Sequence, residues 1–213
     1  MRKSDKTLIL VDVQPTFMPG GSLAVSGGDE IIDPINRLID ISPCTIATQD
    51  WHPPDHKSFA SQHEGKSPGD IGCVGGIDQM LWPDHAVQGT HEASIHHEVR
   101  LDKVDAIIRK GVIADIDSYS GFFDNAKKNE TALNSAIKSA GAKVLYVCGL
   151  ATDFCVKFTV LDALSFGYEV KLIAEACRGV NLNDGDSNNA IAEMTDAGAW
   201  TISIEDAIKE LSS

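Results

Sequence analysis

The fold of this chain is decided by one stretch of sequence, VLYVCGLATDFCV at residues 144–156. Its first part, Val144 to Val147, is apolar and predicts a buried strand, which Gly149 is expected to end. Thr152 or Asp153 can then cap a helix, whose apolar positions continue into the following residues. A strand that leads directly into a helix in this way is typical of a parallel α/β sheet.

Cys155 falls in the first turn of that helix, at the carboxyl end of the strand. Unpaired backbone N–H groups and the positive end of the helix dipole lie there, and both favour a thiolate. The same N–H groups are suited to hold a developing oxyanion. The alternative is a buried, inert thiol, which is the usual state of an isolated cysteine. Its neighbours in the predicted sheet therefore decide between a nucleophile and a packing residue.

In the rest of the chain, strand-like runs alternate with helical stretches in the same manner. The other runs expected as strands are 7–13, 44–48, 104–109, 168–173 and 200–204, and helical spacing covers 31–41, 131–140 and 187–197. Continuous apolar strands separated by helices predict a three-layer α/β/α fold around a mostly parallel, roughly six-stranded sheet. At 213 residues the chain suits one domain over 1–213.

One segment, at about residues 50–93, interrupts the alternation and is rich in Gly, Pro and His. It begins where the second predicted strand ends. Because loops of this length inside a compact domain are usually functional, we expect a loop or cap over the strand ends. Ligands in parallel α/β folds bind at that edge of the sheet.

Two further strand ends carry residues with chemistry. Asp12 has valine on both sides near the end of the first strand, and a buried carboxylate is costly unless it is paired. Lys110 ends the third apolar strand; taken alone, it would be a solvated strand-end lysine. Together with Cys155 these positions supply an acid, an amine and a thiol, which neighbouring strand ends can bring within hydrogen-bonding reach.

The segment at 50–93 offers metal ligands. Asp50 and His52 alternate on an extended chain, so their side chains can face the same way, and His85 follows in the same segment. One carboxylate and two imidazoles suit one divalent ion with open positions for water; we expect zinc, while iron or manganese would also fit. Whether His56 or Ser58 joins this shell is left open. The other histidines are expected on the surface: His63, His91, His96 and His97.

Composition excludes several classes of protein. The net charge is −13, and no cluster of Lys and Arg resembles a nucleic-acid footprint. No apolar run approaches the ~20 residues of a membrane span, and the first residues lack a signal peptide, so a cytoplasmic location is expected. The cysteine count is odd and there is no CxxC zinc pattern, which favours a reducing compartment with Cys44, Cys148 and Cys177 as buried thiols. A homo-oligomer is possible.

The ordered set of motifs is more specific than any one of them: DVQ with Asp12, QDWHP with Asp50 and His52, WPDH with His85, RKG with Lys110, and GLATDFCV with Cys155. In this set the chain resembles the nicotinamidase branch of the isochorismatase-like cysteine hydrolases, from about residue 7 to about residue 204. The resemblance implies an isochorismatase-like fold and hydrolysis of nicotinamide to nicotinate and ammonia through a Cys thioester, with activity on pyrazinamide. NAD salvage is the expected role, and the alternative of nicotinamide catabolism is left open.

The resemblance also implies a role for each residue. Cys155 would be the nucleophile, Asp12 the general base and acid, and Lys110 the third catalytic group. The N–H groups of Ala151 and Cys155 would form the oxyanion hole, next to a cis peptide bond between Leu150 and Ala151. The metal ligands would be Asp50, His52 and His85. The pocket for a flat aromatic ring would be lined by Phe17, Leu23, Trp82 and Tyr119, for which core packing is the alternative.

Four other functions compete with this interpretation. A cysteine amidohydrolase for an N-carbamoyl compound or another small amide would use the same three catalytic residues, but the predicted metal ligands oppose it. Isochorismate cleavage needs no nucleophilic cysteine, so Cys155 opposes it. A non-catalytic binding protein would not need all three of Asp12, Lys110 and Cys155. A purely structural metal site would have four ligands rather than three with room for water.

Overall fold

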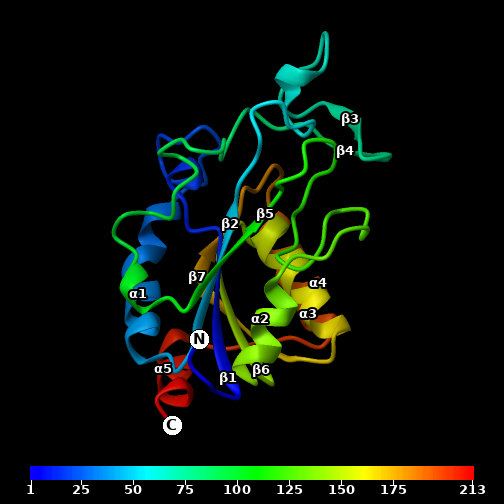
Figure 1. Ribbon diagram of the computed structural model, residues 1–213. Helices are drawn as coiled ribbons and strands as arrows, with labels where there is room; N and C mark the ends of the chain where they lie inside the picture. The colour runs from blue at the N-terminus through cyan, green and yellow to red at the C-terminus, as the bar shows by residue number, and fades with distance from the viewer.

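Six strands form the central sheet: β1 (Lys6–Val11), β2 (Thr45–Asp50), β5 (Ala106–Lys110), β6 (Val144–Leu150), β7 (Glu169–Arg178) and β8 (Trp200–Thr201). The structure is a computed structural model and describes residues 1–213. The strands follow the order β5-β2-β1-β6-β7-β8, and every neighbouring pair is parallel (Figure 1). The predicted α/β fold class is therefore confirmed.

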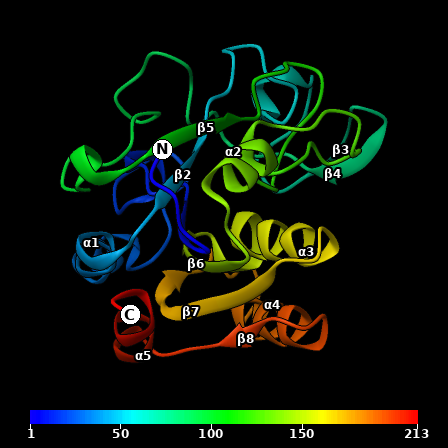
Figure 2. The ribbon, with the colours of Figure 1, turned by 60° about the horizontal axis from the view of Figure 1, so that its bottom comes forward.

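Five helices cover the sheet: α1 (Ile32–Ile41), α2 (Leu133–Ala140), α3 (Lys157–Ser165), α4 (Asp186–Asp196) and α5 (Ile204–Leu211). The helices α1 and α5 lie on one face, and α2, α3 and α4 lie on the other (Figure 2). The central strands β1 and β6 are buried almost from end to end. Their continuous apolar sequence follows from this double cover, because both sides of such a strand face the core.

The stretch at residues 144–156 differs from expectation in where the strand ends. β6 continues through Gly149 to Leu150. Gly149 has a φ of 125°, and a Cβ at this position would overlap the backbone of Val11 in β1. Glycine is therefore required by the close approach of β1 and by its own left-handed conformation, not by a strand end.

The helix cap in the same stretch also differs from expectation. A π-helical turn, Thr152–Val156, leads into α3, and Ala151 occupies its N-cap position without a side-chain hydrogen bond. The Asp153 carboxylate instead accepts a hydrogen bond from the backbone N–H of Val180, at 2.9 Å. The acidic side chain thus anchors the loop after β7, while Cys155 still falls within the first helical turn after β6.

The end of the chain contains a helix that was not predicted. The expected strand at 200–204 is only two residues long, because Ser203 caps α5, which begins at Ile204. The Ser203 hydroxyl accepts a hydrogen bond from the backbone N–H of Asp206 at 3.1 Å, which satisfies a free donor of the first turn. Ala207 and Leu211 of α5 are buried, so its apolar face completes the layer that α1 begins.

A long connecting segment (residues 51–105) joins β2 to β5 and lies beyond the carboxyl ends of the strands, at the top of Figure 1. It contains a two-stranded antiparallel hairpin, β3 (Ile71–Val74) and β4 (Ile77–Met80), which was not predicted. A small hydrophobic cluster, separate from the main core, supports it: Ala60, Val74 and Leu81. The predicted loop is therefore partly folded on its own.

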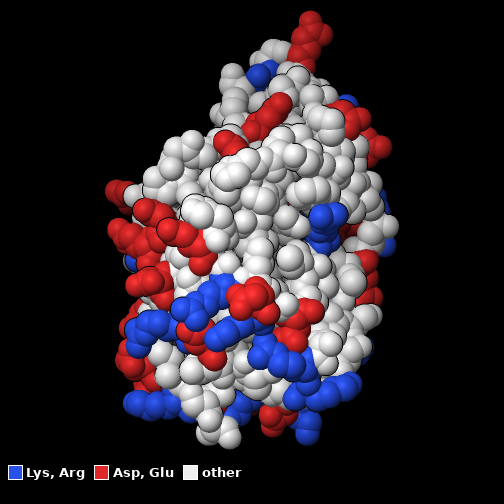
Figure 3. All heavy atoms as spheres, turned by 60° about the vertical axis from the view of Figure 1, so that its left-hand side comes forward, with Lys and Arg blue, Asp and Glu red and all other residues white.

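Charged side chains of both signs share the face that carries α1. In Figure 3, Lys and Arg lie among Asp and Glu in the lower half of this face, below a broad area with few charges. The pairs include Arg37 with Glu205 at 2.7 Å and Arg100 with Asp40 at 2.7 Å.

Among the helices, none combines the length and the apolar character needed to span a membrane. All five cysteines are free; Cys73 is exposed, and the three predicted as buried thiols are buried.

Candidate active site

Asp12, Lys110 and Cys155, named here the cysteine cluster, meet at the carboxyl ends of the strands. The Lys110 Nζ lies 2.9 Å from Asp12 Oδ2 and 3.3 Å from Cys155 Sγ. The Asp12 carboxylate and the thiol lie within 4.8 Å of each other, and all three side chains are buried. The structure thus brings together an acid, an amine and a thiol from β5 and from the residues that follow β1 and β6.

Lys110 has two further contacts that the sequence did not indicate. β5 pairs with β2, and Asp50 lies directly opposite Lys110 in the register of that pair. The Lys110 Nζ consequently contacts Asp50 Oδ1 at 2.6 Å and the Ser118 carbonyl oxygen at 2.9 Å. Asp50, predicted only as a metal ligand, therefore also belongs to the surroundings of the lysine.

Burial controls the protonation states in the cysteine cluster. It raises the pKa of the Cys155 thiol well above its ordinary value, and the nearby Lys110 offsets this only in part. The expectation that this position favours the thiolate is therefore wrong for the free protein. Burial also raises the pKa of Asp12 against the effect of Lys110. For Lys110, burial acts downward, but Asp12 and Asp50 outweigh it and hold its pKa well above the usual value. Lys110 is thus a fixed cation.

Asp12 is held by a residue that the sequence analysis did not single out. The Thr48 hydroxyl donates to Asp12 Oδ1 at 2.6 Å and accepts from the Asp12 backbone N–H at 3.2 Å. These two bonds leave Asp12 Oδ2 directed at Lys110. The available signal was a threonine in a strand expected to be buried, because a buried hydroxyl needs a partner.

Asp50, His52 and His85, named here the histidine cluster, form the second group. Asp50 Oδ2 lies 3.5 Å from His52 Nε2 and 3.8 Å from His85 Nε2. The other nitrogen of each ring, Nδ1, bonds a backbone carbonyl: Gly111 at 2.9 Å from His52 and Pro83 at 2.8 Å from His85. Because a carbonyl only accepts, each Nδ1 carries a proton, and Nε2, which faces Asp50, is the nitrogen that can bind a metal when its ring is neutral.

The histidine cluster fits a divalent metal ion. His52 Nε2 is buried and has no hydrogen-bond partner, a state that costs about 1–3 kcal/mol for a buried polar atom. A divalent metal ion can supply the missing partner, because imidazole nitrogens and carboxylate oxygens are its usual ligands. Burial and the nearby His52 lower the pKa of His85 to about 4, so that ring is neutral at physiological pH. Burial acts in the same direction on His52, but the Asp50 carboxylate outweighs it and raises the pKa of His52, so metal binding there would displace a proton. The donor set of two imidazoles and one carboxylate suits zinc, iron or manganese.

His56 and Ser58 lie beside this cluster but are already engaged. The rings of His52 and His56 have their centroids 4.2 Å apart. The two nitrogens of His56 contact the Ser58 hydroxyl at 2.7 Å and the Ile116 carbonyl at 3.2 Å. His56 also lies with His52 and Asp117 in a second group of side chains that could hold a metal ion, so its place in the metal shell stays open. Of the histidines expected on the surface, His91 and His97 are exposed, and His63 and His96 are half-buried.

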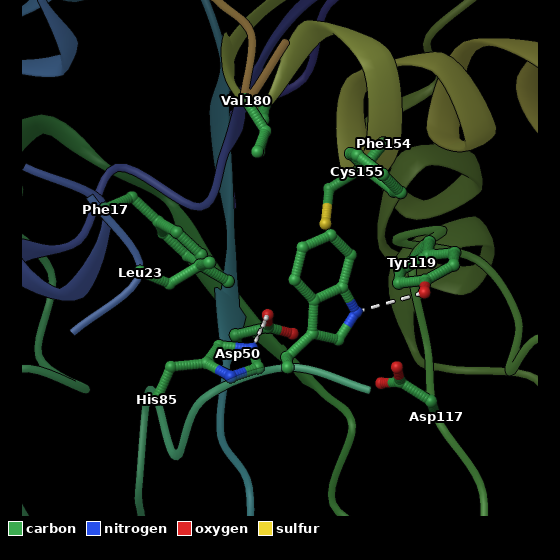
Figure 4. A pocket seen from close by; sticks show the side chains of 11 residues that line it. Phe17, Leu23, Asp50, His85, Asp117, Tyr119, Phe154, Cys155 and Val180 are labelled. Carbon is green, nitrogen blue, oxygen red and sulfur yellow. Dashed lines mark hydrogen bonds and ion pairs between the residues drawn. The ribbon is translucent and has the colours of Figure 1, made fainter. Parts of the chain in front are cut away.

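A pocket opens between the two clusters (Figure 4). Most of its lining residues are hydrophobic, as is typical of small-molecule sites. The Trp82 indole N–H donates to the Tyr119 hydroxyl at 3.1 Å across one wall. The four side chains predicted to line a pocket all line this one: Phe17, Leu23, Trp82 and Tyr119.

The pocket has further lining residues that sequence reasoning missed. Phe154 packs its ring against Trp82 with centroids 4.9 Å apart, and its place next to Cys155 was the available signal. Asp117 and Val180 also line the pocket. Val180 comes from the loop after β7, and nothing in its local sequence marks it.

The predicted oxyanion-hole residues flank the turn at the end of β6. The peptide bond between Leu150 and Ala151 is cis, as the resemblance implied. Ala151 and Cys155 both line the pocket, so their backbone lies beside the thiol. Their role as hydrogen-bond donors to an oxyanion stays a prediction.

Comparison with known proteins places this fold and site in a family. The family model described as the isochorismatase domain matches residues 6–206. The chain therefore belongs to the isochorismatase family.

Among relatives, the chain is 46% identical to a nicotinamidase of Escherichia coli, with 94% of this chain and 96% of that protein covered. Among solved structures, it is similar to a nicotinamidase/pyrazinamidase of Acinetobacter baumanii (TM-score 0.91, 41% identity, 97% and 99% of the two chains). It is also similar to PnC1 of L. infantum in complex with nicotinate (TM-score 0.82, 36%, 97% and 97%) and to a pyrazinamidase of Pyrococcus horikoshii in complex with zinc (TM-score 0.76, 35%, 94% and 99%).

Proposed function

We propose that this protein is a nicotinamidase, an amidohydrolase that converts nicotinamide to nicotinate and ammonia. The observation that carries the proposal is the cysteine cluster, in which Lys110 Nζ bridges Asp12 at 2.9 Å and Cys155 at 3.3 Å beside an aromatic pocket. The 46% identity to a named nicotinamidase over nearly the whole chain supports the same substrate. Pyrazinamide, a ring of similar shape with the same carboxamide, is the expected second substrate.

The ring of the substrate lies among the aromatic side chains of the pocket, with its carboxamide toward Cys155. Phe17, Trp82 and Phe154 supply flat apolar surfaces there, and the edge-to-face packing of Trp82 and Phe154 fixes one wall. A flat ring bound in this manner leaves the amide carbonyl as the group next to the thiol, which is the geometry that an attack requires.

The chemistry begins with the thiol, because burial keeps Cys155 protonated. Asp12 takes the thiol proton as the sulfur forms a bond to the amide carbon, and the carbonyl electron pair moves onto oxygen. The N–H groups of Ala151 and Cys155 stabilise that oxyanion. Asp12 then gives its proton to the amide nitrogen, the C–N bond breaks, and ammonia leaves.

The remaining thioester is cleaved by water. Asp12, again a carboxylate, accepts a proton from the attacking water, and the thiol regains a proton as nicotinate leaves. Lys110 keeps its proton throughout. Its charge lies 3.3 Å from the sulfur and stabilises the thiolate during attack and departure.

Asp50, His52 and His85 would hold one divalent ion, and we propose zinc, supported by the solved pyrazinamidase in complex with zinc. When bound, the ion would supply a Lewis-acid anchor for the ring nitrogen of the substrate. The chain's own contribution is to orient the two imidazoles through the Gly111 and Pro83 carbonyls.

Ammonia release from nicotinamide by the purified protein tests the proposal. We expect turnover by the zinc-loaded protein, a large loss after chelation, and recovery when zinc is restored. Pyrazinamide and an N-carbamoyl amino acid complete the panel. Turnover of the N-carbamoyl compound without turnover of nicotinamide, in zinc-loaded protein, would contradict the proposal and favour an amidohydrolase for another amide.

A further inference from the structure

Gln79 is the buried polar side chain of the β3–β4 hairpin. Its neighbour in the strand, Asp78, points to the other side of β4 and is exposed. Buried amides need partners for both ends, because the NH₂ group only donates and the carbonyl oxygen only accepts. The partners of Gln79 lie outside the hairpin, in the loop that follows β5.

Both ends of the Gln79 amide bind that loop. Its Nε2 donates to Asp117 Oδ2 at 2.8 Å, and its Oε1 accepts from Asn125 Nδ2 at 3.0 Å. Asn125 continues the network, because its Oδ1 accepts from the Tyr119 backbone N–H at 2.8 Å and its own backbone N–H donates to the Asp117 carbonyl at 2.7 Å. Hydrogen bonds therefore join the two ends of the loop at residues 117–125 to each other and to one side chain of the hairpin.

The residues held in this way face the pocket. Asp117 and Tyr119 line it, and in Figure 4 the Asp117 carboxylate lies below the Tyr119 hydroxyl on the same wall. Between them, the Ser118 carbonyl accepts a hydrogen bond from Lys110 Nζ at 2.9 Å. The Gln79 amide thus acts on the pocket wall directly and on Lys110 through one peptide unit.

The connecting segment contacts the loop at residues 117–125 at a second point. The Trp82 indole N–H donates to the Tyr119 hydroxyl, and Trp82 comes from the residues directly after β4. The small cluster of Ala60, Val74 and Leu81 supports the hairpin, and Gly75 in its turn lies against Ile116 of the loop that follows β5. Alongside these apolar contacts, the hydrogen bonds of Gln79 and Trp82 fix the position of the hairpin relative to the loop.

We propose that Gln79 is a positioning residue, through which the β3–β4 hairpin sets the shape of the substrate pocket. This inference rests on the proposed nicotinamidase function. Glutamine is specific to the role, because it offers a donor to the Asp117 carboxylate and an acceptor to Asn125 at once. A glutamate would face Asp117 with a second buried carboxylate, and a leucine would leave Asp117 and Asn125 without their partner.

Steady-state kinetics of Gln79→Leu, Asn125→Leu and the double variant test the proposal, with Asp78→Asn as the matched control in the same strand. We expect each single variant to raise KM for nicotinamide roughly tenfold and to lower kcat by a smaller factor, with zinc content unchanged. The double variant should be no worse than either single variant, because one network is broken in all three. Asp78→Asn should match the wild type.

Gln79→Glu, which keeps the size of the side chain, serves if Gln79→Leu does not fold, and it should also raise KM. A lower melting temperature with unchanged KM and kcat would reduce Gln79 to a structural residue and overturn the proposal. If the KM of the double variant rises by the product of the two single-variant factors, the two residues act independently and the proposal is overturned as well. The wild type separates this inference from the proposed function: absence of wild-type turnover contradicts the function, and turnover by all proteins at one KM contradicts the role of Gln79.

Discussion

The cysteine cluster and the histidine cluster lie side by side at one edge of the sheet, yet they are built in opposite ways. In the first, the single cation of Lys110 sits 2.9 Å from Asp12 and 2.6 Å from Asp50, so two carboxylates share one ammonium group, and Asp12 Oδ2 has this ion pair but no hydrogen bond. In the second, His52 Nε2 is buried without a hydrogen-bond partner. The first is held together by ion pairs within the protein, and the second is arranged to receive an ion. Substitutions should therefore damage the two clusters in different ways.

The largest effect is expected for Cys155→Ala. Removal of the nucleophile should lower kcat for nicotinamide by about 10⁴-fold or more, because the covalent route is lost. Zinc binding should be unchanged, since the histidine cluster keeps its ligands. Ammonia release and zinc titration of the same sample measure both. Cys73→Ala, at the exposed cysteine, is the control. Retained ammonia release would exclude the thioester mechanism.

Lys110→Met tests whether the cysteine cluster is held together by its cation. Asp12 and Asp50 would remain buried without it, and loss of one partner of a buried ion pair costs about 3–5 kcal/mol. Urea unfolding of the metal-free protein measures this loss. Arg109→Met, at the exposed neighbour in β5, should cost far less. Equal stability of the two variants would refute the view that Lys110 closes the cluster.

His52→Ala tests the opposite property of the histidine cluster. Zinc affinity should fall about 100-fold or more, because one of three ligands is lost, and KM should rise with it. Calorimetric titration of the metal-free protein with zinc gives the affinity without reference to activity. The control is His97→Ala at an exposed histidine. An unchanged zinc affinity would remove His52 from the ligand set.

Thr48→Val sharpens the comparison at Asp12. The Thr48 hydrogen bond lowers the pKa of Asp12 against the effect of burial, so its loss should raise that pKa further. Asp12 would then carry its proton to a higher pH, and the acidic limb of the kcat/KM profile should move to higher pH. Thr48→Ser restores the hydroxyl and should restore the limb. If the acidic limb of the kcat/KM profile does not move in Thr48→Val, the group that titrates in that limb is not Asp12.

The smallest effect is expected far from both clusters, at Asp105→Asn. Burial alone would raise the pKa of Asp105, but hydrogen bonds from Arg2 and the Thr45 backbone lower it to about 2. The carboxylate therefore stabilises the fold above its unfolded pKa near 4, and the contribution disappears as the pH falls toward 2. The variant should lose about 1 kcal/mol at pH 7, and the loss should shrink as the pH falls from about 4 and through about 2, by thermal or urea unfolding. A loss of the same size at pH 7 and below pH 2 would contradict this account.

The parts of this molecule that the sequence predicts are those marked by a local pattern, such as the apolar run of each buried strand. Buried parallel strands need continuous apolar runs, so the strands and the residues at their ends could be found along the chain, including Asp12, Lys110 and Cys155. Every residue predicted for the pocket lines it. The catalytic and ligand roles stay predictions until the variants are measured.

The missed parts depend on contacts between distant segments. The pairing of Lys110 with Asp50 follows from the register of β5 on β2, which no local pattern specifies. The hairpin that carries Gln79 has strands of only four residues with mixed polarity, too short for a periodic signal. The depth of burial at Cys155 exceeded what its sequence position indicated, and this reversed the expected protonation of the thiol.

The alternation of side chains along β5 has a consequence for how this family can change. Ile108 and Lys110 point into the protein, while Ile107 and Arg109 face solvent. One residue inserted within this strand, with the pairing to β2 retained before it, would turn Lys110 outward and leave the hydrogen bonds of the sheet available. A single inserted codon would thus take Lys110 away from Asp12 and Cys155 while all three residues remained in the sequence, so the presence of the three residues does not by itself establish a working site.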